Sequence, residues 1–478
     1  MAARSIVATI LAILTVEGGL MLIVPLTDLL LGYEPSQPFT IIALLLLLTG
    51  IAFSRIIEYG KQLTPYEAFI SAAILWLLVP LFSAIALTLD TGMPIYDSFF
   101  ESVSGFTGTG FTVISDVEVL RPSIQLWRSI MQWVGELGVV VFAVILLPHA
   151  YRIITRVYLV ERRKLTPTVL SSAKTITLIY IVLTVAGLIS YMACGMTFFE
   201  ALNHILTTIA TGGMSIYNDS VAPIYHRSPI IIYPILLFMV LGALNFGDLR
   251  YLITFKFSKL LKSSEFKAYL VVLLVLCLLS SMSLYLVDKV DLYHSIIYGT
   301  FHMVSGSTTT GFTLTSLSDL SDVSKALLIA GMFIGGATFS TAGGIKVLRF
   351  VIFMKNLSWS TLRTVVTIPI SVRRNVGEEC ITDEMLISAL NFIVTYVIID
   401  FTLAVALSWV SGTSFIDSLF EMTSAMSCVG LSVGIASASL VLPGKILLIL
   451  GMYLGRIEFI QLYIIIAAIL KRKTGLTI

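Results

Sequence analysis

The sequence has few charged residues for its length. Asp, Glu, Lys and Arg make up 12% of its 478 residues, whereas hydrophobic residues make up 57%. Soluble proteins typically carry roughly twice this share of charge, so the composition excludes a soluble globular protein. The formal net charge is only +2, which gives no indication of a nucleic-acid partner.

The sequence also lacks the patterns of several kinds of enzyme and metal site. Its four cysteines, Cys194, Cys277, Cys380 and Cys428, form no CxxC pair, which argues against a disulfide framework or a thiolate metal site. It contains neither a Walker A sequence nor an HExxH motif, which argues against ATP hydrolysis and zinc proteolysis. We therefore expect no enzyme and no bound cofactor.

Long apolar runs dominate the chain instead. A helix needs about 20 apolar residues to cross the hydrocarbon core of a bilayer, and about ten runs meet this length. They cover residues 5–31, 39–57, 67–90, 125–147, 175–193, 230–255, 267–287, 325–353, 386–410 and 443–470. The sequence thus predicts an all-α, multi-pass membrane protein that begins with a two-helix hairpin over residues 1–62.

A short Gly/Thr-rich stretch recurs four times between these runs, roughly every 100 residues, which is the pattern of internal repeats. Its aligned glycines are Gly110, Gly213, Gly311 and Gly430. Each stretch follows a short amphipathic segment, over residues 96–105, 200–208, 292–306 and 417–426. We predict four parallel helix–pore-loop–helix repeats around a pseudo-fourfold pore, over residues 63–165, 166–262, 263–375 and 376–478.

Non-helical backbone is tolerated in a bilayer only where it is buried in protein or lines a water-filled cavity. One such stretch is typical of close helix packing, but four in the same register favour a shared cavity. Glycine allows carbonyls to turn toward a common axis, where they can replace the hydration shell of a monovalent cation. The predicted filter residues are Thr107, Gly108, Thr109, Gly110, Ala210, Thr211, Gly212, Gly213, Thr308, Thr309, Thr310, Gly311, Ser427, Cys428, Val429 and Gly430.

The basic residues predict the orientation. Most of the 30 Lys and Arg residues fall in loops on the N-terminal side, so the positive-inside rule places both termini in the cytoplasm. The four short helices then run inward from the outer face. Their C-terminal ends carry partial negative charge, which favours a cation and argues against an anion.

Two features suggest a barrier below the filter. The run from Gly335 and Gly336 to Gly343 and Gly344, followed by Lys346, is too glycine-rich for a regular helix. It predicts either a kink or a movable gating loop. Arg456 lies within the last apolar run and either pairs with Glu136, Asp248 or Asp400, or projects into the path as an electrostatic barrier.

Two sets of polar residues remain open. Nine positions before the aligned glycines stand Glu101, His204, His302 and Glu421, which we interpret as anchors of the short helices, with a metal site as the alternative. Glu17 lies in the first apolar run beside two glycines. An ionisable residue there is a functional candidate by default, although a paired structural role is favoured.

These stretches resemble those of the Trk/Ktr/HKT superfamily of potassium transporters, and specifically its TrkH-like members. The resemblance covers nearly the whole chain and includes Asn245-Phe246-Gly247, Gly343-Gly344-Ile345-Lys346 and Gly455-Arg456-Ile457-Glu458. It implies potassium uptake through a channel-like pore in the cell membrane, a homodimer, and control by a cytoplasmic nucleotide-binding subunit of the TrkA kind. It also implies that the third-repeat loop and Arg456 form the gate.

The resemblance has one departure and leaves two alternatives open. In the family, glycine at every filter position accompanies K⁺ preference, and Gly110 fits this pattern, whereas Glu136 stands where a small residue is expected. One alternative function is a secondary transporter that couples K⁺ to H⁺ or Na⁺. The other is a membrane-embedded metalloenzyme that uses the Glu101, His204, His302 and Glu421 set.

Overall fold

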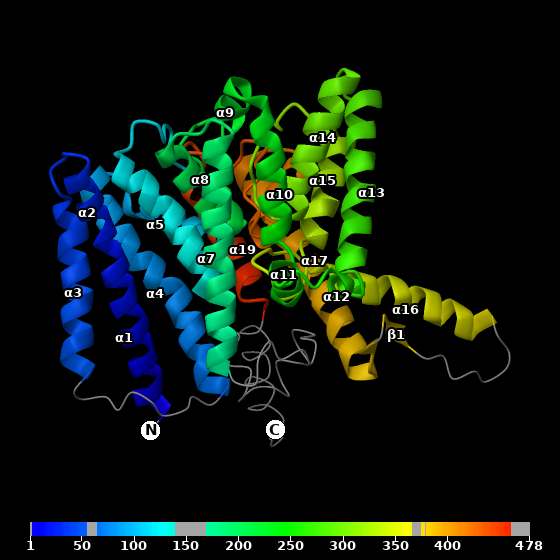
Figure 1. The fold of residues 1–478 in the computed structure, drawn as a ribbon, viewed down its shortest axis with the longest axis horizontal. Helices are drawn as coiled ribbons and strands as arrows, with labels where there is room; N and C mark the ends of the chain where they lie inside the picture. The colour runs from blue at the N-terminus through cyan, green and yellow to red at the C-terminus, as the bar shows by residue number, and fades with distance from the viewer. Residues whose placement is uncertain (1, 55–64, 139–168, 366–373, 378, 460–478) are drawn as a thin grey trace.

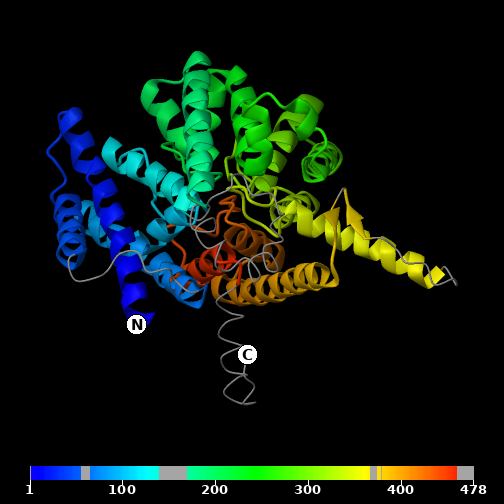
Figure 2. The ribbon, with the colours of Figure 1, turned by 60° about the horizontal axis from the view of Figure 1, so that its bottom comes forward.

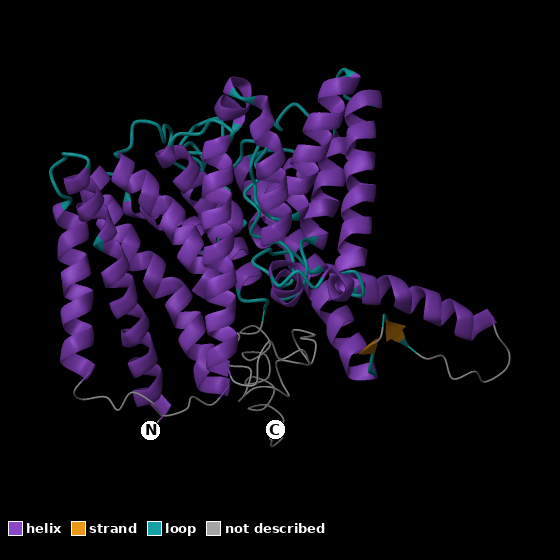
Figure 3. Cartoon of the chain, in the orientation of Figure 1, coloured by secondary structure: helices purple, strands orange, loops and turns teal. Residues whose placement is uncertain are grey.

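A computed structural model describes residues 2–54, 65–138, 169–365, 374–377 and 379–459. Within these ranges the chain is mostly helical, and the strands there are β1 (Asn375–Val376) and β2 (Glu379–Cys380), which pair antiparallel. Five of the described helical stretches are long and apolar enough to cross a membrane. Figure 3 shows the long helices running roughly side by side, with loops at one end and in the interior. The structure therefore agrees with a multi-pass membrane protein.

The N-terminal hairpin consists of α1 (Ala2–Met21), α2 (Ile23–Leu30) and α3 (Gln37–Ser54). The run predicted as one span is thus interrupted at Leu22. A proline ring collides with the carbonyl four residues earlier in a helix, and the residue four before Pro25 is Met21, where α1 ends. α1 and α3 pack closely. At Gly50 there is no space for a side chain, since an ideal Cβ there would lie 1.8 Å from Thr15 Oγ1.

Four long helices each pack against one short helix. The long helices are α4 (Pro65–Thr91), α7 (Val169–Ala193), α13 (Ser264–Leu286) and α17 (Asp383–Ser411). Their short partners, called half-helices here, are α5 (Ile95–Phe106), α8 (Phe198–Ile209), α14 (Leu292–Ser307) and α18 (Phe415–Met426). Side-chain caps fix the start of three half-helices: Thr197 caps α8, Asp291 caps α14 and Ser414 caps α18.

Return helices lead away from the half-helices. They comprise a helix over residues 122–138, α10 (Ile232–Gly242), α15 (Asp322–Ile334) and α19 (Leu442–Arg456). Smaller elements are α9 (Ala222–Arg227), η1 (Pro229–Ile231) and α12 (Phe257–Leu260). The predicted spans over 125–147 and 443–470 continue beyond residues 138 and 459, outside the described residues.

Two return segments are broken. The prediction of one continuous span over residues 230–255 is wrong, because α10 ends at Gly242 and α11 (Phe246–Ile253) begins after Asn245. The Asn245 side chain accepts a hydrogen bond from the N–H of Gly247 at 2.8 Å, which stabilises a new helix start. Further along the chain, α15 gives way to a loop over residues 335–346 before α16 (Val347–Val365). This loop lies where the glycine-rich run predicted a break.

The return helices also contact the half-helices that follow them. α10 packs on α14, α15 on α18, and α19 on α5, so the last return helix meets the first half-helix. Figure 1 shows α11 and α12 side by side below α10, with α16 leaving the bundle beside them and extending outward. In Figure 2 the colours succeed one another around the middle of the molecule, from blue through green and yellow to red.

The tight contact between α1 and α3 predicts a stability effect. Replacing Gly50 with Val should place methyl groups where Thr15 lies and lower the stability of the protein, since overpacking typically costs about 1–3 kcal/mol. Thermal unfolding in detergent would measure this. Gly19→Val is the matched control, because a Cβ on Gly19 meets nothing within 4 Å. Equal melting temperatures for the two variants would contradict close packing of the hairpin.

Candidate functional site

Each half-helix ends where a predicted filter segment begins. The residues that cap the C-terminal ends of α5, α8, α14 and α18 are Thr107, Ala210, Thr308 and Ser427. The last carbonyls of a helix have no partner inside it and carry partial negative charge. Four helix ends of the same polarity therefore lead into the four segments.

The four segments share an unusual backbone conformation. In each, the aligned glycine and the residue two before it have positive φ; the pairs are Gly108 and Gly110, Thr211 and Gly213, Thr309 and Gly311, and Cys428 and Gly430. Left-handed residues that alternate with right-handed ones gather successive N–H groups on one side of the chain. Positive φ is uncommon outside glycine, so Thr211, Thr309 and Cys428 indicate a shared structural constraint.

The N–H groups of each segment bind back to their own half-helix. Those of Thr109 and Gly110 donate to the carbonyl of Ser104 at 3.0 and 3.3 Å. Equivalent bonds run from Gly212 and Gly213 to Thr207, from Thr310 and Gly311 to Ser305, and from Val429 to the carbonyl and Gly430 to the hydroxyl of Ser424. The hydroxyl residue six positions before each glycine is therefore the point at which the segment is attached.

The segments approach one another so closely that only glycine fits between them. An ideal Cβ on each aligned glycine would meet a carbonyl oxygen of the next segment: 1.9 Å from Gly110 to Gly212, 1.9 Å from Gly213 to Thr310, 2.0 Å from Gly311 to Val429, and 2.1 Å from Gly430 to Thr109. The contacts run from the first segment through the second and third to the fourth and back to the first. They form a closed cycle.

The aligned Glu/His residues bind the chain that follows each glycine. Glu101 accepts hydrogen bonds from Thr112 and Val113, and Glu421 from Ser432, Val433 and Ala436. His204 contacts Ser215 Oγ at 3.0 Å, and His302 accepts from the N–H of Leu314 at 3.0 Å. All four side chains lie within the half-helices and bind the chain after the glycine. They therefore anchor the segments, and the prediction that they anchor the helix starts is wrong. No group of three metal-ligating side chains occurs among the described residues.

Side chains from neighbouring repeats hold the segments together. Gln132 donates to the carbonyl of Gly212 at 2.7 Å and accepts from the N–H of Met214 at 3.0 Å. Buried lysines of two return helices pair with half-helices, Lys325 of α15 with Asp417 of α18 and Lys445 of α19 with Asp97 of α5, both at 2.6 Å. Sequence reasoning missed the role of Gln132, although an amide within an apolar run was a usable signal.

The loop over residues 335–346 contacts three of the segments near their half-helix ends. The N–H of Gly343 donates to Thr309 Oγ1 at 2.8 Å, and a Cβ on Gly343 would lie 1.9 Å from the carbonyl of Ser427. Thr341 donates to the carbonyls of Ile209 and Gly242 and accepts from Thr211. Gly335, Gly344 and Lys346 have positive φ, which a regular helix does not allow.

Arg456 forms a buried ion pair with Glu136. Its Nη1 lies 2.7 Å from Glu136 Oε1, and its Nη2 donates to the carbonyl of Gly135 at 3.2 Å. Its guanidinium also lies over the ring of Trp76, 5.2 Å from the centroid. Of the three carboxylates considered, Glu136 is the partner. The same carboxylate lies behind the first segment, 2.1 Å from an ideal Cβ on Gly108.

Acidic residues occur in the loop that follows the first segment. Asn218 donates to Asp116 at 2.8 Å, and this hydrogen bond lowers the pKa of the exposed Asp116 carboxyl. Asp116 is therefore ionised at neutral pH. The bond also joins the loops of the first two repeats.

The Glu136–Arg456 pair predicts a large loss of stability when one charge is removed. Replacing Glu136 with Gln should destabilise the protein by roughly 3–5 kcal/mol, because it leaves a buried guanidinium without a counter-charge. Replacing both residues with Gln should recover part of that loss. A double-mutant cycle on unfolding in detergent measures the coupling. Purely additive effects would contradict the pairing.

The comparisons with known proteins cover nearly the whole chain. The family described as TrkH, cation transport protein, matches residues 39–474. An uncharacterized cation transporter of Methanocaldococcus jannaschii is 31% identical over 86% of this chain and 84% of its own. The Trk system potassium uptake protein TrkH of Halomonas elongata is 29% identical over 86% and 87%.

The fold has a counterpart among solved structures. The crystal structure of the potassium transporter TrkH from Vibrio parahaemolyticus matches with a TM-score of 0.86 at 26% identity, covering 97% of this chain and 98% of the other. Because these relatives are transporters, the alternative of a metalloenzyme is wrong, and the Glu/His set serves the loops. With a family match over residues 39–474, the chain belongs to the TrkH family of cation transport proteins.

Proposed function

We propose that this protein takes up potassium across the cell membrane through a channel-like pore whose filter consists of the four segments. The closed cycle of contacts among Gly110, Gly213, Gly311 and Gly430 is the observation that supports it most directly. Relatives described as Trk system potassium uptake proteins support potassium as the cargo. The half-helix ends favour a cation there.

The filter works by substituting carbonyl oxygens for water. N–H groups bound to Ser104, Thr207, Ser305 and Ser424 leave the carbonyls of each segment directed away from the half-helix. A ring of such oxygens can compensate a K⁺ ion for its lost hydration shell. No further cofactor is needed, since the transported ion is the only ligand that this chemistry uses.

The gate consists of the loop over residues 335–346 together with Arg456. Gly335, Gly336, Gly343, Gly344 and Lys346 give this loop its irregular backbone, and Thr341 and Gly343 attach it beneath the segments. The guanidinium of Arg456 lies beside the first segment; because Glu136 balances its charge, it obstructs the path mainly by its size. A cation would meet both obstacles after the filter, so movement of the loop controls conduction.

The charge distribution and the family resemblance support the remaining parts of the proposal. Basic residues on one side place both termini in the cytoplasm by the positive-inside rule, and the segments then open to the outside. The chain assembles as a homodimer. A cytoplasmic nucleotide-binding subunit of the TrkA kind regulates it.

Substitutions at the aligned glycines should impair selective uptake. Gly430→Ala or Gly110→Ser places a Cβ against the next segment's carbonyl and forces a side chain into positive φ, so K⁺ affinity should fall and Na⁺ should enter. Ion flux into proteoliposomes under K⁺ and Na⁺ gradients is the measurement. Gly412→Ala is the control, because Gly412 also has positive φ but a Cβ there meets nothing within 4 Å. Unchanged K⁺/Na⁺ selectivity in substitutions at all four glycines would refute the filter.

Loosening the loop should increase the basal flux. Thr341→Val keeps the shape of the side chain but removes the hydroxyl that binds Ile209, Gly242 and Thr211. Rb⁺ flux in proteoliposomes without a regulatory subunit should therefore rise severalfold. Ser340→Ala is the control, since among the described residues the Ser340 hydroxyl donates within the loop, to the carbonyl of Ala337 at 2.6 Å. A flux that Thr341→Val leaves at the wild-type level would argue that this loop is not the barrier.

A further inference from the structure

An apolar cavity lies between the N-terminal hairpin and the first repeat, away from the four segments. Its volume is about 150 Å³, and its walls come from α1, α4, the end of α5 and the helix over residues 122–138. Apolar side chains dominate the lining; among them are Leu20, Leu75, Val79, Phe106 and Ile130. This cavity is partly open, and its volume is about that of an engineered apolar cavity that holds a benzene ring.

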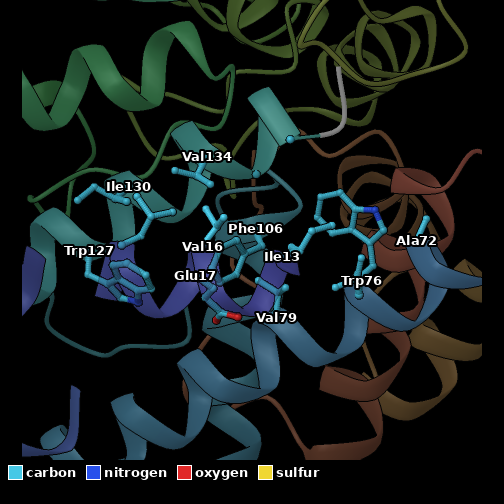
Figure 4. A pocket seen from close by; sticks show the side chains of 14 residues that line it. Ile13, Val16, Glu17, Ala72, Trp76, Val79, Phe106, Trp127, Ile130 and Val134 are labelled. Carbon is cyan, nitrogen blue, oxygen red and sulfur yellow. The ribbon is translucent and has the colours of Figure 1, made fainter. Parts of the chain in front are cut away.

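One carboxyl group lies in this apolar lining. Glu17 on α1 is 4% exposed, and neither of its carboxyl oxygens has a hydrogen-bond partner among the described residues. Figure 4 shows Glu17 among the surrounding apolar side chains. A buried charge without a partner costs several kcal/mol, and no described contact of Glu17 offsets that cost. The paired structural role that the sequence favoured for Glu17 is therefore not seen among the described residues.

We propose that this cavity is a binding site for a small hydrophobic amine whose nitrogen pairs with Glu17. Without a partner in this apolar lining, Glu17 is most stable as the uncharged acid, and an amine that takes up its proton leaves a carboxylate that accepts hydrogen bonds from the ammonium group. An ammonium group supplies both the donor and the opposite charge. The ring or alkyl part of the amine fills the apolar space around it.

The chemistry of the cavity selects an amine over an inorganic cation. A bare alkali ion needs a shell of oxygens to replace its water, and Glu17 provides two. An amine and a carboxylic acid remain neutral as a pair whichever of them holds the proton, so no net charge is buried. The body of the ligand gains hydrophobic free energy from the apolar lining.

The cavity can be reached from the bilayer and lies beside residues that contact Arg456. Val16 lines it and is 62% exposed on a helix that faces hydrocarbon, so an amphiphilic amine can enter from the bilayer. Trp76 and Gly135 also line it, and both contact Arg456. An occupant therefore touches the residues that hold the Arg456–Glu136 pair.

Benzylamine is the probe for the test, and benzyl alcohol is its uncharged counterpart. The full chain in phosphatidylcholine nanodiscs is titrated with each, and binding is followed by tryptophan fluorescence and calorimetry against empty nanodiscs. We expect saturable binding of benzylamine that weakens at least tenfold in Glu17→Gln and in the cavity-filling variant Ala72→Leu. Glu34→Gln, the same change on an exposed side chain, should leave it unchanged.

Benzyl alcohol separates loss of the carboxylate from loss of the cavity. It should bind wild type and Glu17→Gln equally and Ala72→Leu weakly, which also shows that Glu17→Gln retains its fold. Equal benzylamine affinity in wild type and Glu17→Gln, or uptake that never saturates, would overturn the proposal. No ion flux is measured, so the result is independent of whether the protein conducts potassium.

Discussion

The central constraint on this structure is that backbone leaving a helix inside a membrane must still satisfy its polar groups. Each segment does so by giving its N–H groups to a residue of its own half-helix and by packing its glycine on a carbonyl of the next segment. The two requirements together leave no room for a Cβ at Gly110, Gly213, Gly311 or Gly430. The half-helices, anchors and lysine bridges hold the four segments at that distance.

The sequence predicted the parts of this arrangement that depend on local chemistry. The length of the apolar runs identified the long helices. The four aligned glycines located the segments, because a positive φ and a close neighbouring carbonyl together restrict a position to glycine. The break between α1 and α2 also has a local cause, because the ring of Pro25 excludes a regular helix at the carbonyl four residues earlier, that of Met21. Glycine content likewise indicated the interruption between α15 and α16.

Other features depend on contacts between distant residues, which one sequence does not reveal. Three carboxylates were equally plausible partners for Arg456, and only the packing of the helix over residues 122–138 on α19 selects Glu136. The interruption after α10 has only a weak local signal, which is Asn245, the residue that caps α11. The rest depends on the distant loop over residues 335–346, which binds the backbone between α10 and α11. From the sequence, Glu101 and Glu421 were interpreted as anchors of the helix starts. In the structure they accept hydrogen bonds from residues eleven or more positions later in the chain.

The Lys445–Asp97 ion pair has a consequence for biosynthesis. Its two residues are 348 positions apart, and α19 must be made before it can reach α5. During translation the first three repeats are therefore made before α19, and until then the side of α5 that α19 covers has no helix packed on it. A chain that ends before the fourth repeat would lack Lys445, so Asp97 would lose its ion-pair partner and α5 would lose the helix that packs on it.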